Sequence, residues 1–495
     1  MPERVARPRR AAADFAALLL VLLCLIPPDG VLSGNEENYF QLAAQSVSLV
    51  PPAPESAVFD GSHHRVLADH VFGWLVAVAG FAGAQIVARA RAAGAYALAL
   101  GALFRRFGLD ALDGVLVVIV FALLGQAMFG GEWLFSGAEA KVAAYVLVLA
   151  GLALVLGGGS LLRAALLFAG ATWFHFLVGG FWFLAALALR LLEERRALRR
   201  VATAAGLYLL LIAPLVAWIA ASRLGAAQAL GGTPSPDYIY AALRVPHHTM
   251  PFLDTGTFLA HWLRGALFAG GMLACSLVVA RLPEAARLRP VALWLALLLC
   301  GLALALAAAA LDQTSGALGK FYLFRPAALM LLLWLALMLA MLGRLGLGHR
   351  SALRLLALVL LAPPFLVGAT TRVAGDLGRR SDGAASLAPI LAQAAAPGDV
   401  VLIDPALEPA FFDVERRTGH PALVLWKFVP ADDAGIIEWY RRIRFRDAVF
   451  AQGCAGKSAY RFDFLLATPD HAAALARSCG AAVASGGRWV LLRRG

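Results

Sequence analysis

Charged residues are scarce in this chain. Of its 495 residues, only 15% are charged and 61% are hydrophobic, whereas average soluble domains have about 25% charged and about 45–50% apolar residues. This composition excludes an ordinary soluble globular protein. The apolar runs also lack the alternation of apolar and polar residues that marks a transmembrane β-barrel, so a barrel is excluded as well.

The sequence contains instead a series of apolar runs, most of them roughly 17–25 residues long. Such a run forms a helix long enough to cross about 30 Å of hydrocarbon. We predict a multi-pass α-helical membrane protein with about eleven transmembrane helices. The expected spans are 14–32, 81–104, 112–130, 141–158, 160–174, 176–193, 201–221, 258–280, 290–311, 321–342 and 351–369.

Basic residues are grouped between the apolar runs. The net charge is +12, which in a soluble protein would suggest a nucleic-acid partner. Here the grouping is the positive-inside pattern of membrane proteins, so we expect membrane lipids and no nucleic acid as partners. The N-terminus is then cytoplasmic, and an odd number of spans places the C-terminus outside. Arg89 and Arg91 stand within the second span, where they either snorkel or face a polar cavity.

Three long segments fall on the outer side under this topology. Residues 1–369 form the predicted membrane domain, with outer loops 34–80 and 222–257, and residues 370–495 form a separate outer domain. Short apolar runs at 400–403, 422–425, 464–467 and 489–492 are predicted strands, and 436–444 and 472–479 are predicted helices. This alternation predicts a small α/β domain with a mostly parallel sheet.

The five cysteines divide into two groups. Cys24, Cys275 and Cys300 lie in apolar runs and are expected to be packing residues. Cys454 and Cys479 lie in the polar tail, where an oxidising exterior would allow a disulfide between them or leave both free. No Cys/His spacing resembles a structural zinc site.

Acidic residues in the membrane part gather just past the outer ends of spans. The first group is Asn35, Glu36 and Glu37, followed by Tyr39. Adjacent carboxylates at a membrane surface can remove the proton of an attacking hydroxyl. The alternative is a helix start, in which Asn35 is the N-cap and the two glutamates favour the positive end of the helix dipole.

Two further groups fall on the same side. Glu132, Glu139 and Lys141 lie in the next outer loop, and Arg244, His247 and His248 lie in the long second loop. Paired histidines bind metal or hydrogen-bond sugars and phosphate, but neither this pair nor His63 and His64 completes a metal-ligand spacing. We therefore predict no metal site and no certain cofactor; a divalent metal is conceivable but unsupported.

Lys320 and Arg325 are cations at the outer mouth of a span, on the side where basic residues are rare. An anionic partner such as a lipid phosphate explains them, because Arg binds phosphate bidentately and Lys binds it as a point charge. The alternative for Lys320 is snorkelling at the interface.

Taken together, these motifs resemble the GT-C superfamily of integral membrane glycosyltransferases. The likeness rests on the acidic motif after the first span, an interfacial helix at about 63–80, the turn Arg105-Arg106-Phe107-Gly108 and the outer C-terminal domain. Within the superfamily, the Gly-Gly-Glu-Trp, Glu-x-Lys, Pro-His-His and Trp-Tyr-Arg-Arg elements are similar to those of a bacterial group. The chain departs from the common pattern in having Asn35 where an aspartate is usual.

The resemblance implies an inverting sugar transfer from a polyprenyl-phosphate donor to a glycan, lipid or protein hydroxyl, on the outer face of a bacterial inner membrane. Glu36 or Glu37 would be the general base, with Asn35 beside it. Lys320 and Arg325 would bind the lipid phosphate. The remaining candidates would shape the sugar and acceptor sites; they are Tyr39, Glu132, Glu139, Lys141, Arg244, His247 and His248. The alternatives are a transporter or flippase of lipid-linked sugars, or a surface-polysaccharide polymerase or ligase.

Overall fold

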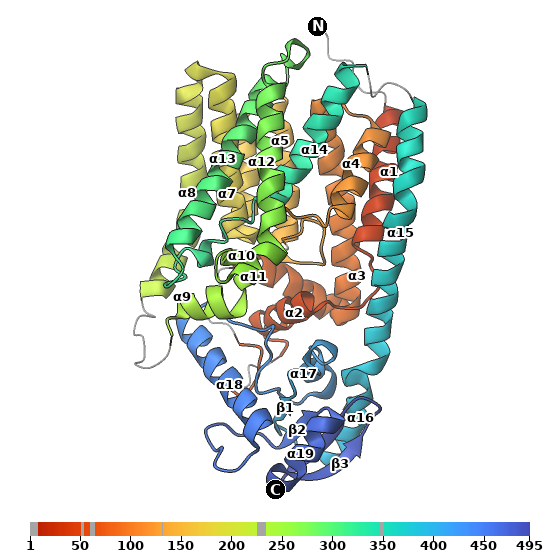
Figure 1. Cartoon of the computed structure of the whole chain (residues 1–495), viewed down its shortest axis with the longest axis vertical. Coiled ribbons are helices and arrows are strands. Elements are labelled where there is room, and N and C mark those ends of the chain that lie inside the picture. Colours follow the sequence, from red (N-terminus) through yellow and green to blue (C-terminus); the bar gives the residue numbers. More distant parts are fainter. Residues whose placement is uncertain (1–7, 51–53, 60–64, 131, 225–233, 347–350) are drawn as a thin grey trace.

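The protein consists of a bundle of long helices with a smaller α/β domain at one end (Figure 1). The structure is a computed structural model, and it describes residues 8–50, 54–59, 65–130, 132–224, 234–346 and 351–495. A multi-pass helical fold with a C-terminal α/β domain, as predicted, is therefore observed.

Eleven helices make up the bundle in the described part of the chain, and each overlaps one expected span. They are α1 (Pro8–Leu25), α3 (Val66–Phe107), α4 (Ala111–Leu123), α5 (Ala140–Leu156), α6 (Leu161–Phe174), α7 (Phe176–Glu193), α8 (Leu198–Leu224), α12 (Leu263–Val279), α13 (Arg289–Leu311), α14 (Ala327–Arg344) and α15 (Ser351–Asp382). Seven of the helical segments are long and apolar enough to cross a membrane. The apolar parts of α1, α4, α5 and α6 have only 13 to 17 residues, about 20–25 Å at 1.5 Å per residue.

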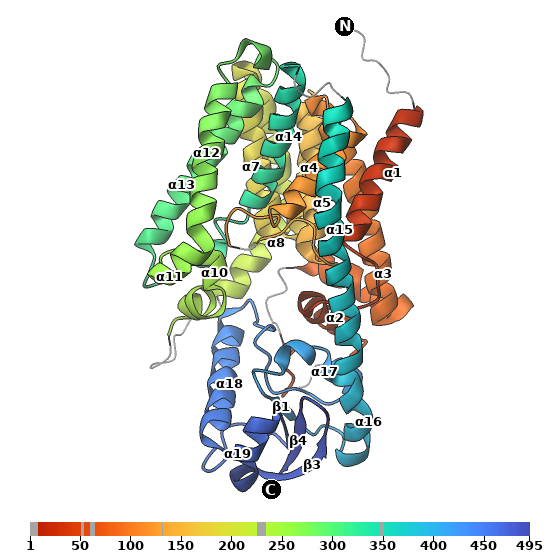
Figure 2. The ribbon, with the colours of Figure 1, turned by 45° about the vertical axis from the view of Figure 1, so that its right-hand side comes forward.

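The basic clusters share one end of this bundle. Arg105 and Arg106 are in the last turn of α3, and the turns η1 (Arg195–Ala197) and η4 (Pro283–Ala285) carry further arginines around them. The C-terminal domain lies at the opposite end (Figures 1 and 2). The bundle is therefore polarised in charge, as the sequence predicts.

Helix α3 is two helices joined at a kink. Gly80 has φ +67 and ψ 173, a conformation that glycine adopts without a steric penalty. The kink separates a first helix, which packs with α2 (Gly34–Ser46), from the apolar second helix. This is the predicted break between an interfacial helix and the second span.

Several short elements lie between the bundle and the C-terminal domain (Figure 2). Besides α2 they include α9 (Pro236–Tyr238), the π-helix η2 (Ile239–Arg244), α10 (Pro246–Thr249), α11 (Thr255–Thr257), the π-helix η3 (Phe258–Trp262) and η5 (Gly319–Phe321). They carry most of the candidate site residues.

The C-terminal domain begins later than predicted. Helix α15 runs on past residue 370 to Asp382, through Gly375 and Gly378, and α16 begins directly after Gly383. The domain then contains α16 (Ala384–Ala394), β1 (Val401–Ile403), η6 (Glu408–Ala410), α17 (Val414–Thr418), α18 (Asp433–Gln452), β2 (Phe464–Ala467), α19 (Pro469–Cys479), β3 (Gly480–Ser485) and β4 (Val490–Arg494).

The sheet corrects the prediction of mostly parallel pairing. Its order is β1-β2-β4-β3, and only β1 and β2 are parallel. The apolar run 422–425 is buried but forms only one bridge, between Ala422 and Val401. In its place β3, which directly follows α19 and is mostly exposed, pairs antiparallel with β4. A disulfide joins Cys454 and Cys479, with Cα atoms 5.0 Å apart.

Candidate active site at the end of the helical bundle

The first acidic motif begins helix α2, and its N-cap is Ser33. The Ser33 hydroxyl accepts from the Glu36 backbone amide, and the Glu36 carboxylate accepts from the Ser33 amide in return. This reciprocal pair is a capping box. The prediction of Asn35 as N-cap is therefore wrong; the signal that identifies the cap is the Ser-x-x-Glu spacing of Ser33 and Glu36.

Glu36 is fully buried, and both of its carboxylate oxygens accept hydrogen bonds. Arg89 donates from Nε to Oε1 at 2.8 Å and from Nη2 to Oε2 at 2.5 Å. The Ala138 amide also donates to Oε1, at 2.5 Å. With the Ser33 amide, four donors saturate the two carboxylate oxygens. Burial alone would raise the pKa of Glu36, but the Arg89 guanidinium and these amides hold it below its usual value.

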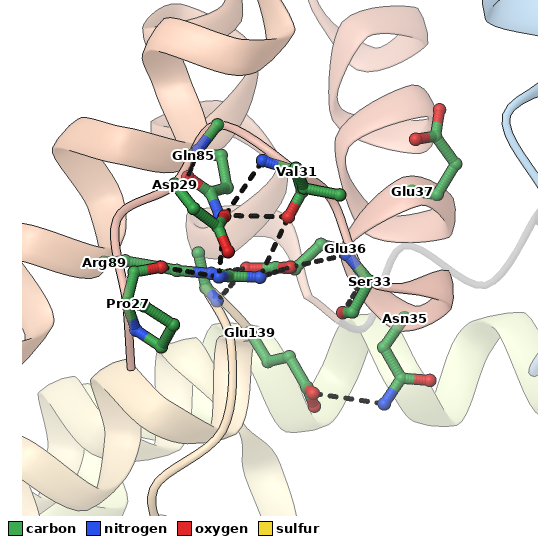
Figure 3. A network of polar contacts seen from close by, with 12 residues as sticks. Pro27, Asp29, Val31, Ser33, Asn35, Glu36, Glu37, Gln85, Arg89 and Glu139 are labelled. Atoms are coloured by element: carbon green, nitrogen blue, oxygen red, sulfur yellow. Dashed lines mark hydrogen bonds and ion pairs between the residues drawn. The ribbon is translucent and has the colours of Figure 1, made fainter. Parts of the chain in front are cut away.

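Arg89 does not snorkel; it is buried in a polar network (Figure 3). Besides Glu36 it binds Asp29 and the carbonyl oxygens of Pro27 and Val31. Gln85, one helical turn before Arg89, donates to the same Asp29 oxygen at 2.8 Å. The network fixes the loop between α1 and α2 against the second half of α3.

Glu37 points away from this network (Figure 3) and toward the C-terminal domain. Arg416 of α17 binds both of its oxygens, at 2.6 and 3.0 Å, and Gln41 donates to Oε1. Burial raises the pKa of Glu37 although Arg416 opposes the shift. Glu37 also lines a separate cavity of about 190 Å³ between α2 and α17. The two adjacent glutamates therefore belong to different surroundings.

The structure brings Asn35, Glu139, Lys141, Glu132 and Arg325 into one chain of polar contacts. Asn35 Nδ2 donates to Glu139 Oε1 at 3.1 Å. Lys141 lies between Glu139 and Glu132, at 3.5 and 3.6 Å from their oxygens. Arg325 Nε donates to Glu132 Oε1 at 3.1 Å. Residues from three separate parts of the sequence thus converge, as their common outer side predicts.

Arg325 is held on its other sides by rings. Its Nη1 donates to Nε2 of His175, the single residue between α6 and α7, at 2.8 Å. The guanidinium carbon lies 3.9 Å from the centre of the Tyr322 ring, and the Tyr322 and Tyr240 hydroxyls are 2.8 Å apart. Sequence reasoning assigned no role to His175 or to these tyrosines, because ring contacts across three segments leave no local pattern.

Glu132 and the histidines His247 and His248, which lie in two different loops, have their pKa values shifted in ways that fix their charges. Burial alone would raise the pKa of Glu132, but Arg325 and Lys141 lower it to about 2. Burial lowers the pKa of His248 to about 3 even though Glu132 opposes the shift. Burial and the nearby Arg244 also lower the pKa of His247. At neutral pH Glu132 is therefore an anion and His248 is a neutral imidazole.

Lys320 is not part of this chain of contacts. Its ammonium group pairs with Asp237 of α9 and, at 2.6 Å, with Asp433 of α18. It therefore joins the bundle to the C-terminal domain. Lys320 and Arg325 were predicted to act together on a phosphate, but the structure places them in separate surroundings.

An apolar groove of about 570 Å³ has Arg325 in its lining. Most of its walls come from α7 and α13, including Phe176, Phe181, Leu298 and Leu302, and Tyr145, Tyr322 and Arg325 add polar groups. The groove thus combines a largely apolar lining with one cation.

Metal ligands do not gather in the described part of the chain. No group of three or more His, Cys, Asp or Glu residues there could hold a metal ion. His63, His64 and Gly131 lie outside the described residues.

Comparison with solved structures finds similar folds. The structure is similar to the crystal structure of the Archaeoglobus fulgidus oligosaccharyltransferase tethered with an acceptor peptide, with a TM-score of 0.44, 12% sequence identity, and coverage of 93% of this chain and 69% of that chain. No protein-family profile and no curated protein sequence matches the chain.

Proposed function

We propose that the protein is a membrane glycosyltransferase of the GT-C type, which transfers a sugar from a polyprenyl-phosphate donor to an acceptor hydroxyl. One observation carries the proposal: an apolar groove is lined by a cation, Arg325, which binds a buried carboxylate of the polar cluster. A lipid-linked phosphate needs both an apolar wall for its chain and a donor group for its phosphate.

The donor is bound along the groove. Its chain lies against the apolar walls from α7 and α13, and its phosphate reaches the free edge of the Arg325 guanidinium. Glu132 and His175 fix that guanidinium from behind, so it is oriented before the donor arrives. Such a preorganised cation stabilises the negative charge that develops on the leaving phosphate.

We assign the general base to Glu139. Glu36 accepts four hydrogen bonds and holds Arg89, and Glu37 binds Arg416 at a different cavity. Glu132 is a weak base because its pKa is about 2. Glu139 is buried, and Asn35 occupies only one of its oxygens while Lys141 stands 3.5 Å from the other.

The reaction is a single displacement. Glu139 takes the proton of the acceptor hydroxyl as that oxygen bonds to the anomeric carbon, and the bond from this carbon to the phosphate oxygen breaks. The electron pair leaves with the phosphate, and the anomeric configuration inverts. Asn35 and Lys141 position Glu139, and Glu36, through Arg89 and the Ala138 amide, fixes the loop that carries it.

The charge distribution supports the side of the membrane that we propose. With the arginine-rich end cytoplasmic, as the positive-inside rule favours, the site and the C-terminal domain would face the periplasm of a bacterial inner membrane. The acceptor is a glycan, a lipid or a protein. A flippase or transporter is the weaker alternative, because such proteins place polar groups near the bilayer midplane, whereas these acids gather at one end of the bundle.

The proposal is tested by transfer from a bacterial lipid extract. The purified protein is incubated with the extract, and consumption of glycosylated polyprenyl phosphate is followed by mass spectrometry. Glu139→Gln is expected to lower the rate by about 10²–10⁴-fold, the usual contribution of a general base. Glu284→Gln, at the arginine-rich end, is the matched control and should leave the rate unchanged. Full activity of Glu139→Gln would refute the assignment of the base.

A further inference from the structure

Arg244 and Lys427 form a pair of neighbouring cations where the bundle meets the C-terminal domain. Arg244 ends the π-helix η2, and its Nη2 donates to the Lys427 carbonyl oxygen at 3.4 Å. Its guanidinium lies over the Trp426 ring, 5.7 Å from the centre. Trp426 in turn packs on Trp439, with ring centres 5.1 Å apart.

Neither cation has an ion pair with a carboxylate in the part of the chain that the structure describes. Arg244 Nε is buried and has no hydrogen-bond partner there. Glu408 is the acid that acts on both cations, and Glu139 acts more strongly on Lys427. Glu408 is already engaged by Arg446 at 2.7 Å and by the Lys427 backbone amide at 3.1 Å, and Glu139 faces Lys141. Burial lowers the pKa of Arg244, and burial together with the adjacent Arg244 lowers the pKa of Lys427.

Three other cations of this end of the bundle are paired. Lys141 faces Glu132 and Glu139, Arg416 binds Glu37, and Lys320 binds Asp237 and Asp433. Arg244 and Lys427 are both partly buried. Withdrawing a charge from water without a partner costs free energy, and a second like charge beside it adds to that cost. The fold therefore keeps an arrangement here that lowers its own stability.

We infer that Arg244 and Lys427 form an anion subsite, separate from Arg325, which binds a phosphate or carboxylate group of a substrate. The two halves of the molecule each supply one cation, so the subsite exists only when the C-terminal domain is docked. Arg is suited to bidentate contact with such a group and Lys to a point contact.

Its position ties the subsite to the proposed reaction. Tyr240, one helical turn before Arg244, contacts Tyr322, and Tyr322 lies under Arg325. The anion is thus carried either by the donor, as a second phosphate beyond the one at Arg325, or by the acceptor, as an acidic sugar. Only this choice of carrier rests on the proposed function; the binding of an anion does not.

Binding is measured on the full chain in nanodiscs, with inorganic pyrophosphate and an oligogalacturonate as separate probes and a neutral oligosaccharide of equal length as control. At least one anionic probe should bind, and the Arg244→Gln/Lys427→Gln variant should weaken that binding at least about tenfold. Arg244→Lys/Lys427→Arg, which keeps both charges, should retain most of it. Binding of pyrophosphate assigns the subsite to the donor, and binding of oligogalacturonate assigns it to the acceptor.

A stability measurement separates this account from a structural role. Without any probe, Arg244→Gln/Lys427→Gln should melt at a higher temperature than the wild type, because two neighbouring, partly buried charges without ion pairs are removed. Addition of the bound probe should raise the melting temperature of the wild type and not that of the variant. Failure of both anionic probes to bind the wild type, or a lower melting temperature of the variant, would overturn the inference. Loss of transfer in Glu139→Gln bears on the proposed function and not on this result.

Discussion

One ion pair from each end of the helical bundle shows how far burial differs between them. At the arginine-rich end, the pair of Arg200 and Glu194 leaves 57% and 42% of the side chains exposed. At the end that meets the C-terminal domain, Arg89 and Glu36 leave 5% and 0% exposed. Exposed pairs contribute little to stability, and buried pairs often no more than an apolar replacement would. The buried pairs are therefore better explained as devices that hold side chains in one geometry.

The largest expected difference between the two ends comes from removing Arg89. The Arg89→Met variant leaves the Glu36 carboxylate buried without its cation, and we expect a loss of about 3–5 kcal/mol in the free energy of unfolding. Denaturant unfolding of the purified protein measures this loss. The corresponding change at the other end, Arg200→Met, should shift it by less than about 0.5 kcal/mol.

A second variant identifies the cause of that loss. In Arg89→Met/Glu36→Gln the buried charge is gone, and we expect most of the lost stability to return. If the double variant is as unstable as Arg89→Met alone, the loss comes from packing around Arg89 and not from an unpaired charge.

The apolar groove can be changed without touching any ion pair. Gly301 of α13 lines the apolar groove, and a Cβ atom there would have nothing within 4 Å. Gly301→Phe should fill the groove and raise the KM for the lipid donor by about tenfold or more, within the range that pocket shape controls. Steady-state rates with the donor extract measure it.

Gly270 of α12 provides the matched control. It also has open space around its Cβ position and does not line the groove. Gly270→Phe should leave the KM unchanged. Equal effects of the two substitutions would show that bulk in the bundle, rather than occupation of the groove, reduces activity.

The most local expected effect concerns pH at the junction of the two domains. Burial raises the pKa of Glu415 to about 7, although Ser56 and the Ala57 and Ala422 amides bind its carboxylate. Because this pKa is above the ordinary value of about 4.3, the folded state binds the proton more tightly than the unfolded state. The contribution of Glu415 to stability is then full below about pH 4 and is lost as pH rises through 7.

Hydrogen exchange at the Ala57 amide is expected to report this loss. Its protection should fall between pH 5 and pH 8, after correction for the intrinsic dependence of exchange on pH. Glu415→Gln, which is neutral throughout, should abolish the change, whereas Glu438→Gln in α18 should not. A pH-independent protection in the wild type would contradict the raised pKa.

The sequence predicted the bundle well because each helix there needs an apolar run, and eleven such runs are visible. It also predicted which polar loops face the same end, since the basic turns fix the direction of each helix. The sheet was harder. Strand β3 is exposed and rich in alanine, so no apolar alternation marks it, and the apolar run 422–425 is buried without pairing along a strand.

The sequence predicted which residues gather at the site but not which contacts they make with one another. Glu132, Glu139 and Arg325 were recognised as polar residues on one side, and they do meet. That Glu36 is saturated by Arg89 depends on a contact 53 residues away. That Lys427 meets Arg244 depends on a contact 183 residues away. Spacing along the chain encodes neither contact.

The most direct test of the central claim is mass spectrometry of the lipids that copurify with the protein in mild detergent. We predict a polyprenyl phosphate or its glycoside with the wild type, and its loss in Arg325→Gln. Arg354→Gln removes an arginine that pairs with Asp110 and Asp113 near the arginine-rich end, and it should retain the lipid. Absence of any polyprenyl lipid from the wild type, or its full retention by Arg325→Gln, would contradict the account.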